Sequence, residues 1–422
     1  MNVGSRGPKL HWLSYPLIYL MGMLYNSAVV NVGNSGIPLY VVAVLMMAAS
    51  ILWRARGIKR DEAFLIGSCV LALVLTTAVH VLSDTHSSSE FTQLGSRIFY
   101  LVSFAVCAQF VRLADPEGRS FLRALRWLTV CYVLVGFHEY WAKLSGSTGL
   151  VEWVANNQSY KVAAGLNGGW LGESSARIRT FWAEPSASVL PVMLSLYFLL
   201  TGRLFGTRFG NVLWTLLVLC YAYLTGSRNV YFVVIFLFAA FIYIRGCAKF
   251  GRRWVVPGMR LGFLMIIVFA FTWQLAVGFY FDDLSAAGRA SSVRVGIGVW
   301  LQNFAFGTGF NTFEAQSFKY GMSGGGITTE SIIQSSFLAN LQQAGLIGTL
   351  AVFAPLMFAI RKTKERWLEV GPLWLCLLAV CGISAGMEFS SMFWLVSAVM
   401  LAVRPAVQGP FGAGQSNAMR RA

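Results

Sequence analysis

The chain has 422 residues and a net charge of +16, and 56% of its residues are hydrophobic while only 12% are charged. A soluble globular domain carries roughly 25% charged residues, so this chain cannot cover a soluble surface of the ordinary kind. The composition excludes an ordinary soluble enzyme. Basic loops beside a membrane explain the positive charge better than nucleic-acid binding does, and we expect no nucleic acid as a partner.

Continuous apolar runs recur along the whole chain. A bilayer core needs about 20 apolar residues per helix, and strands with open edges cannot cross it. The runs do not alternate as the strands of a β-barrel would. We therefore predict an all-α integral membrane protein with about twelve transmembrane helices. The predicted helices lie near residues 12–30, 36–53, 62–82, 96–113, 121–142, 186–202, 210–225, 229–245, 261–280, 331–360, 371–386 and 391–404.

The positions of Lys and Arg predict the orientation. Cytoplasmic loops carry an excess of these residues, and with the N-terminus inside, every basic gap between predicted helices faces the cytoplasm. Both termini are then cytoplasmic. Only nine of the 33 Lys and Arg fall outside, namely Arg97, Lys143, Lys161, Arg177, Arg179, Arg228, Arg289, Arg294 and Lys319.

We predict one polytopic membrane domain over residues 1–422, with two long external loops and a flexible C-terminal tail at 405–422. The loops span residues 143–185 and 281–330. Loops longer than about 15 residues are usually functional or disordered. These two are rich in aromatic residues and glycine, a composition that favours short helices docked at the membrane surface.

Metal binding and disulfides are not expected. The seven cysteines fall in apolar runs or in a predicted cytoplasmic loop. Adjacent acids at Asp282 and Asp283 lack supporting ligands for a metal. The sequence therefore predicts neither a metal site nor another cofactor.

External arginines are the first candidates for chemistry. Arg177 and Arg179 form one pair and Arg289 and Arg294 another. Arginine makes bidentate contacts to phosphate oxygens and stays charged, so the set favours an anion site. The alternative is that these residues are solvated loop charges or anchors to lipid head groups.

The segment that enters the sixth predicted helix contains the first pair. Pro185 suits the first turn of a helix, whose positive dipole end would then face Arg177 and Arg179. Glu184 lies beside these cations in sequence. From the residues alone, Glu184 is either a general base or the counter-ion of an arginine.

Other residues at the external ends of predicted helices are weaker candidates. Arg228 is the only charge in a very short external turn, where a lone charge is a functional candidate. Glu139 and Glu388 could line an external cavity or be interfacial polar groups. In the second long loop, Ser291 or Ser292 is predicted to cap a short helix that carries Arg294. The alternative there is an amphipathic surface helix without chemistry.

At these residues the chain resembles the bacterial O-antigen polymerase (Wzy-type) and O-antigen ligase superfamily. The resemblance in topology covers most of the chain, but its specific motifs are short and lie between about 177 and 350. They are Arg179-Thr-Phe-Trp-Ala-Glu-Pro-Ser186, Gly226-Ser-Arg-Asn229, Arg294 through Trp300 to Gly307-Thr-Gly309, and Asn340-Leu-Gln-Gln-Ala-Gly-Leu-Ile-Gly348.

The resemblance implies a substrate and an activity. The superfamily uses glycans carried on undecaprenyl diphosphate at the periplasmic face of the inner membrane, in lipopolysaccharide or exopolysaccharide biosynthesis. It implies a metal-independent glycosyltransferase, with membrane lipids and a chain-length-regulating co-polymerase as further partners. Ligases use a catalytic His in the large external loop, and the second long loop here contains none. This departure favours a polymerase.

The resemblance also implies roles for the residues. Glu184 would activate the acceptor hydroxyl, and Arg294 would act with it at the reacting centre. Arg177, Arg179, Arg228 and Arg289 would bind the diphosphates. Two alternatives remain open: an O-antigen ligase, and a twelve-helix transporter or flippase of lipid-linked oligosaccharide. A transporter typically has repeats and broken helices at mid-membrane depth, and no repeat is visible.

Overall fold

The structure is a computed structural model of the chain. It describes residues 16–18, 28–32, 35–54, 57–83, 87, 89–145, 178, 188–280, 284–313, 316, 333, 335–384 and 386–403. For residues 28–32, 35–37, 252, 270–271, 273–280, 284–289 and 388 it describes the backbone only.

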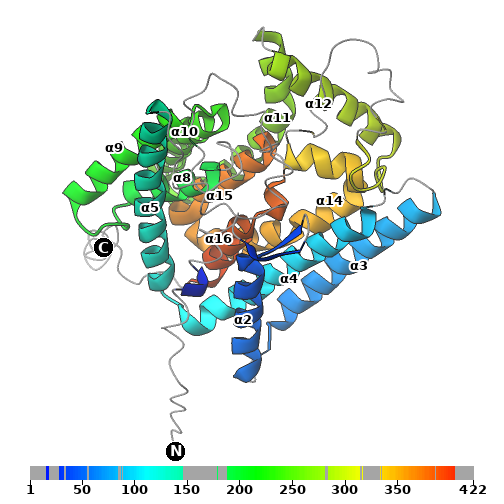
Figure 1. Cartoon of the computed structure of the whole chain (residues 1–422), viewed down its shortest axis with the longest axis horizontal. Helices are drawn as coiled ribbons and strands as arrows, with labels where there is room; N and C mark the ends of the chain where they lie inside the picture. The colour runs from blue at the N-terminus through cyan, green and yellow to red at the C-terminus, as the bar shows by residue number, and fades with distance from the viewer. Residues whose placement is uncertain are drawn as a thin grey trace, which may run out of the picture.

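Helices make up nearly all of the described chain (Figure 1). One small antiparallel hairpin, β1 (Ala28–Val32) with β2 (Ser35–Pro38), precedes them. The α-helices are α2 (Leu39–Trp53), α3 (Arg60–Leu82), α4 (Glu90–Ala114), α5 (Arg119–Leu144), α8 (Val189–Leu200), α9 (Arg208–Leu224), α10 (Arg228–Lys249), α11 (Val255–Tyr280), α12 (Leu284–Gln302), α14 (Ser336–Lys362), α15 (Trp367–Ile383) and α16 (Ser391–Ala402). Short 3-10 turns are η2 (Arg252–Trp254), η3 (Lys364–Arg366) and η4 (Met387–Phe389).

The described helices are those of a membrane protein. Six of them are long and apolar enough to cross a membrane: α3, α4, α5, α10, α14 and the stretch Lys364–Ile383. Further apolar helices, among them α2, α8, α9 and α16, are shorter. The helical membrane class is thus confirmed, while twelve spans with two external loops stay a prediction.

Two predicted boundaries are wrong. The first helix is predicted to end at residue 30. Residues 28–32 instead form β1. The β-branched residues Val29, Val30 and Val32 favour this extended conformation. In the second long loop, α12 begins at Leu284, so Ser291 and Ser292 lie inside the helix and do not cap it. Alanine is a good helix former, so Ala286 and Ala287 allow the helix to begin ahead of the two serines.

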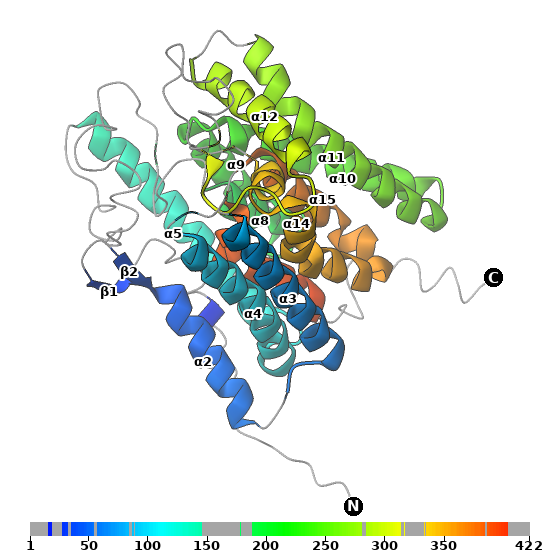
Figure 2. The same ribbon diagram turned by 90° about the vertical axis from the view of Figure 1, so that its right-hand side faces the viewer.

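The centre of the bundle is formed by α15 and α16. Every residue of α15 from Val370 to Ile383 is buried. A helix that is apolar on all sides belongs inside a bundle, which is where Figure 1 shows α15 and α16, in orange and red. Around them, α4 packs on α16, α3 packs on α14, and α10 and α11 pack on α15. Figure 2 shows α2, α3 and α4 side by side.

The helix ends form two chemically different ends of the bundle. We call the end where α3 and α5 begin and α4 and α14 finish the basic end, because most of the Lys and Arg residues that the structure describes lie there. There Arg112 of α4 forms a bidentate ion pair with the buried Glu62 of α3. Lys362 of α14 pairs with the half-exposed Asp61 at 3.0 Å. The opposite end, where α4, α10, α14 and α16 begin, we call the motif end.

The two ion pairs at the basic end give a test of the packing. Glu62→Ala is expected to lower the free energy of unfolding by about 3 kcal/mol, because it leaves Arg112 mostly buried without this carboxylate. Asp61→Ala is expected to cost no more than about 1 kcal/mol, since its pair is exposed to solvent. Thermal unfolding of both variants in one detergent checks this. Equal losses would contradict the burial of the Glu62–Arg112 pair.

Candidate functional site

Helix α14 is broken at Gly345, inside the motif Asn340–Gly348. Gly345 has φ +62° and ψ −168°, a backbone conformation that is essentially restricted to glycine. A break in a helix leaves carbonyl and amide groups without their usual partners four residues away. Inside a membrane these groups need partners from the protein itself. Another segment must therefore complete the break.

The segment Phe304–Gly309, which contains the Gly-Thr-Gly motif, completes it. Amides of this segment donate to carbonyls before the break, and carbonyls of the segment accept from amides after it. The donor–acceptor pairs are Thr308 to Gln342 and Gly309 to Gln343, each at 3.0 Å, Leu346 to Phe304 at 2.9 Å and Ile347 to Ala305 at 3.1 Å. Two motifs singled out in the sequence thus bond to each other through the backbone.

Two glycines permit this close approach. A Cβ atom on Gly307 would lie 2.5 Å from backbone atoms of Gln343, and one on Gly345 would lie 2.4 Å from backbone atoms of Ala305. Real Cβ atoms do not come so close to backbone. Glycine is therefore needed at both positions for the segment to lie in the break.

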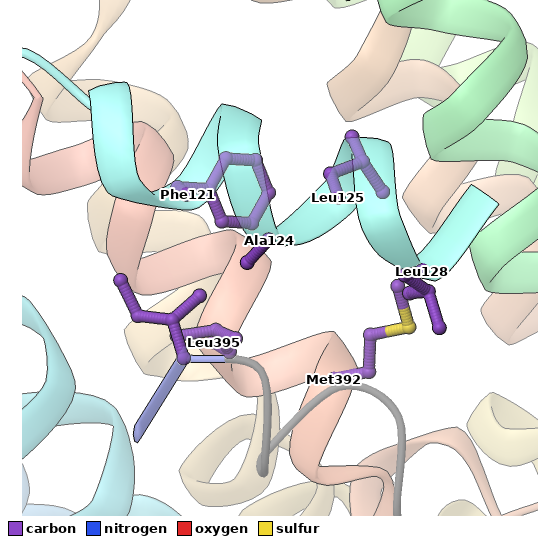
Figure 3. Close-up of a pocket in the computed structure, with 7 residues that line it drawn as sticks. Phe121, Ala124, Leu125, Leu128, Met392 and Leu395 are labelled. Atoms are coloured by element: carbon purple, nitrogen blue, oxygen red, sulfur yellow. The ribbon is translucent and has the colours of Figure 1, made fainter. Parts of the chain in front are cut away.

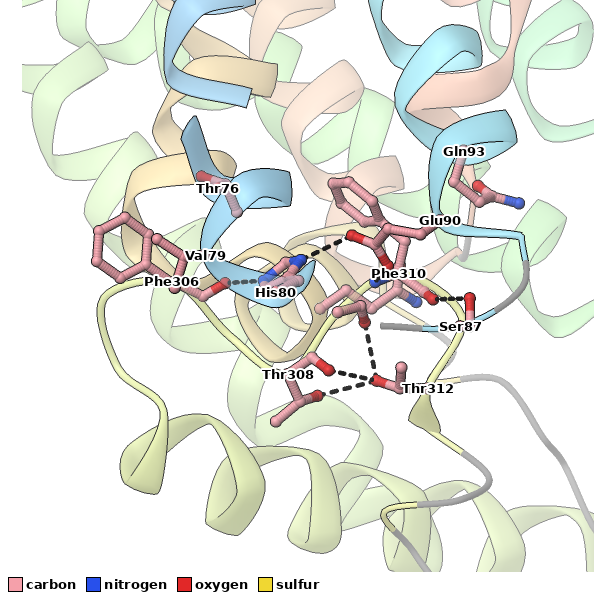
Figure 4. Close-up of polar contacts among 12 residues, drawn as sticks. Thr76, Val79, His80, Ser87, Glu90, Gln93, Phe306, Thr308, Phe310 and Thr312 are labelled. Atoms are coloured by element: carbon pink, nitrogen blue, oxygen red, sulfur yellow. Dashed lines mark hydrogen bonds and ion pairs between the residues drawn. The ribbon is translucent and has the colours of Figure 1, made fainter. Parts of the chain in front are cut away.

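Polar side chains of α3, of α4 and of Ser87 between them hold the chain at Phe306 and Phe310, as Figure 4 shows. The amide of Phe310 donates to Glu90 Oε2 at 2.6 Å, and Ser87 Oγ donates to the Phe310 carbonyl at 2.7 Å. His80 Nδ1 lies 2.7 Å from Glu90 Oε1, and His80 Nε2 lies 2.7 Å from the carbonyl oxygen of Phe306. His80 and Glu90 are both fully buried.

A buried arginine covers the ring of Phe310. The guanidinium carbon of Arg97 lies 4.0 Å from the ring centroid of Phe310 and 4.8 Å from that of Phe389. Its Nη2 donates to Gln343 Oε1 at 3.1 Å, and its Nη1 donates to Gln93 Oε1 at 3.2 Å. An arginine buried within a candidate membrane helix is a functional candidate by default. Arg97 links α4, the segment after α12, η4 and the broken helix.

The buried side-chain amide of Gln342 extends this hydrogen-bond network. Gln342 Nε2 donates to Thr308 Oγ1 at 2.6 Å, and Thr308 and Thr312 share a hydrogen bond at 3.0 Å. The Gln342 Oε1 atom is fully buried and has no hydrogen-bond partner among the residues that the structure describes. Ordered water commonly satisfies a buried polar atom of this kind.

The beginnings of α10 and α14 meet near Ser384. The Ser384 carbonyl accepts from the amide and hydroxyl of Ser336, at 3.0 and 2.7 Å. Asn229 Nδ2 donates to Ser384 Oγ at 3.2 Å, and the amide of Met387 donates to Ser336 Oγ at 2.9 Å. The N-termini of α10 and α14, which carry partial positive charge, thus lie close together, and α15 ends beside them at Ile383.

The sequence-predicted residues fall into three groups. Arg228 and Arg294 are exposed at the motif end: Arg228 begins α10 beside Asn229, and Arg294 lies on α12 beside the buried Val293. Glu139 is buried and forms an ion pair with Lys143 at 2.9 Å.

The remaining predicted residues lie outside what the structure describes. This group contains Arg177, Arg179 and Glu184, together with the side chains of Arg289 in α12 and Glu388 in η4. Ile178 is described: it is buried, and its amide donates to the Leu224 carbonyl at 3.2 Å, in the last turn of α9.

Sequence reasoning missed His80 and Glu90 as site residues. A signal existed, since an ionisable residue inside an apolar run is a functional candidate. The bond from His80 to Phe306 joins residues 226 apart in the chain, and no local pattern predicts such a pair.

The described residues form no metal site, and a pocket among them is apolar. No group of three His, Cys, Asp or Glu side chains is placed to hold a metal ion. A pocket beside α5 and α16 (Figure 3) has only apolar walls. Its lining residues are Ile18, Phe121, Ala124, Leu125, Leu128, Met392 and Leu395. It offers no group that could orient a polar substrate.

Comparison of the chain with protein-family models and with curated protein sequences finds no match.

Proposed function

We propose that this protein is a membrane glycosyltransferase of the O-antigen polymerase type. It would move a growing glycan from undecaprenyl diphosphate onto a lipid-linked repeat unit, at the periplasmic face of the bacterial inner membrane. One observation supports the proposal: the Gly307–Gly309 motif and the Asn340–Gly348 motif, both of which resemble motifs of that superfamily, bond to each other at the motif end of the bundle.

The proposed reaction is a displacement at the anomeric carbon of the donor glycan. A hydroxyl oxygen of the acceptor sugar forms the new bond to that carbon, and the bond from the carbon to the diphosphate breaks. The electron pair leaves with undecaprenyl diphosphate, and the hydroxyl proton passes to the carboxylate of Glu184. Cations that are already in place stabilise the charge that develops on the leaving group.

The proposed roles are supported unequally. Arg228 and Arg294 are exposed at the motif end, as cations that meet a diphosphate need to be. The amide of Ile178 bonds to the carbonyl of Leu224, four residues before Arg228. The roles of Arg177, Arg179, Glu184 and Arg289 rest on the resemblance.

Charge removal at Arg294 tests the proposal. Arg294→Ala is expected to slow glycan extension about 100-fold, the loss typical of removing one preorganised stabilising group. Arg208→Ala is the matched control, since Arg208 is an exposed arginine at the start of α9, at the basic end. Turnover is measured with purified protein and the lipid-linked repeat unit. Equal turnover of both variants would remove Arg294 from the site.

A transporter is the second candidate, and one observation favours it. Broken helices line the substrate sites of many transporters, where unwound carbonyls bind ions. Here α14 is broken, but the carbonyls of Gln342 and Gln343 before the break accept hydrogen bonds from Thr308 and Gly309. These groups therefore fix a segment of the protein, which suits a positioned transferase site better than an ion site.

The ligase alternative differs from the polymerase in its acceptor. Purified protein that attaches glycan to a different lipid or protein, and does not lengthen lipid-linked glycan, would favour the ligase.

A further inference from the structure

The two bonds of His80 restrict where its protons lie. Its Nε2 atom is 2.7 Å from the Phe306 carbonyl oxygen, which can only accept a hydrogen bond, so Nε2 carries a proton. The other ring nitrogen, Nδ1, lies 2.7 Å from Glu90 Oε1. A bare Nδ1 and an ionised carboxylate oxygen would repel at this distance. One proton must therefore lie between them.

The His80–Glu90 pair consequently holds one shared proton. Written with the proton on Glu90, the pair is a neutral acid donating to a neutral imidazole. Written with the proton on His80, it is an ion pair. In both forms Glu90 Oε2 accepts from the Phe310 amide, and His80 donates to the Phe306 carbonyl. Both ends of the stretch Phe306–Phe310 are thus attached to this pair.

The charged groups around the pair are few. Among the described residues at the motif end, α4 contributes Arg97, which covers the opposite side of Phe310. The charged residues of α14 are Arg361 and Lys362, and those of α3 other than His80 are Arg60, Asp61 and Glu62, all at the basic end. Asp84 and His86, between α3 and α4 in sequence, lie outside the described residues.

We propose that His80 and Glu90 are positioning residues, which hold Phe306–Phe310 against the break in α14 only while they share this proton. Without this proton, a bare nitrogen would lie against a carboxylate and the contact would open. The expected effect of this opening on turnover rests on the proposed glycosyltransferase function. The expected release of Phe306–Phe310 does not depend on that function.

Glu90→Gln separates this proposal from simple packing. A glutamine amide donates to His80 Nδ1 and its carbonyl accepts from the Phe310 amide, so it reproduces the protonated acid but cannot lose a proton. Glu90→Ala removes both contacts. Glu90→Gln should therefore keep turnover, whereas Glu90→Ala should lose it. His138→Gln, which changes a histidine of α5, serves as the control.

Thiol labelling tests the release directly. Thr308→Cys places a reporter at a buried position of the segment, and a water-soluble maleimide measures its exposure, with the unchanged chain as background. At one pH, labelling should be at least about 10-fold faster with Glu90→Ala than with Glu90 or with Glu90→Gln, the reporter thiol having the same intrinsic reactivity in all three. Thr312→Cys is the second reporter.

The outcomes are distinct. Equal labelling with Glu90 and with Glu90→Ala would overturn the proposal, as would labelling that is as fast with Glu90→Gln as with Glu90→Ala. If labelling behaves as expected while the unchanged protein never extends a glycan, the positioning pair stands and the proposed function fails.

Discussion

Gly345→Ala is expected to destabilise the protein more than any other single change considered. The backbone conformation at Gly345 costs about 1–3 kcal/mol for a residue with a side chain. The new Cβ atom would also displace the backbone of Ala305. This displacement breaks four backbone hydrogen bonds worth about 1 kcal/mol each. The expected loss is roughly 5–7 kcal/mol, measured as thermal unfolding in detergent, with glycan extension abolished.

Gly298→Ala is the matched control for that variant. Gly298 lies inside α12, and a Cβ atom added there meets nothing within 4 Å. Alanine in a helix interior is favoured over glycine by about 0.5–1 kcal/mol, so this variant should be slightly stabilised. Comparable losses in both variants would show that the segment Phe304–Gly309 does not lie in the break.

Arg97→Ala is expected to have the second-largest effect. The change removes two cation–π contacts, worth about 2 kcal/mol each when desolvated, and leaves a gap between the rings of Phe310 and Phe389. We expect a loss of about 4 kcal/mol in the free energy of unfolding and no glycan extension. Unfolding midpoint and turnover are measured on the same sample.

Arg97→Met separates fold from function. Methionine fills much of the same volume without charge, and replacing a buried ion by an apolar residue is often neutral for stability. This variant should fold but should not turn over. Full turnover of folded Arg97→Met protein would show that the cation has no part in the site.

Hydropathy predicted the helices well because burial in lipid imposes long apolar runs. Thus α4, predicted at 96–113, is found at Glu90–Ala114, and α15, predicted at 371–386, is found at Trp367–Ile383. The prediction failed at residues 28–30, where valines suit either helix or strand in an apolar setting. Apolar content alone does not distinguish the two for short stretches.

The candidate site was only partly predictable. The motifs around Gly307 and Gly345 were identified, but residues 331–360 were expected to form one continuous helix. The break at Gly345 depends on the segment Phe304–Gly309, nearly forty positions earlier in the chain. The sequence alone does not show that this segment lies in the break. His80 and Glu90 were missed for the same reason, because their partners Phe306 and Phe310 are distant in sequence.

The broken helix gives the site a fixed shape rather than a loose surface. Backbone hydrogen bonds, two glycines without side chains and a buried arginine all locate the same short segment. Such over-determination is typical of sites in which reacting groups must be held within a fraction of an ångström. It also explains why residues that never touch a substrate are expected to affect turnover.

Glycan extension by the purified protein tests the central claim most directly. The protein in liposomes receives undecaprenyl-diphosphate-linked repeat units, and the products are separated by length on a gel. A ladder of lengthening glycans, present with the unchanged protein and absent with Arg294→Ala, is the predicted result. Folded protein that gives no ladder, and instead carries the intact repeat unit across the bilayer or transfers it to another acceptor, would contradict the polymerase.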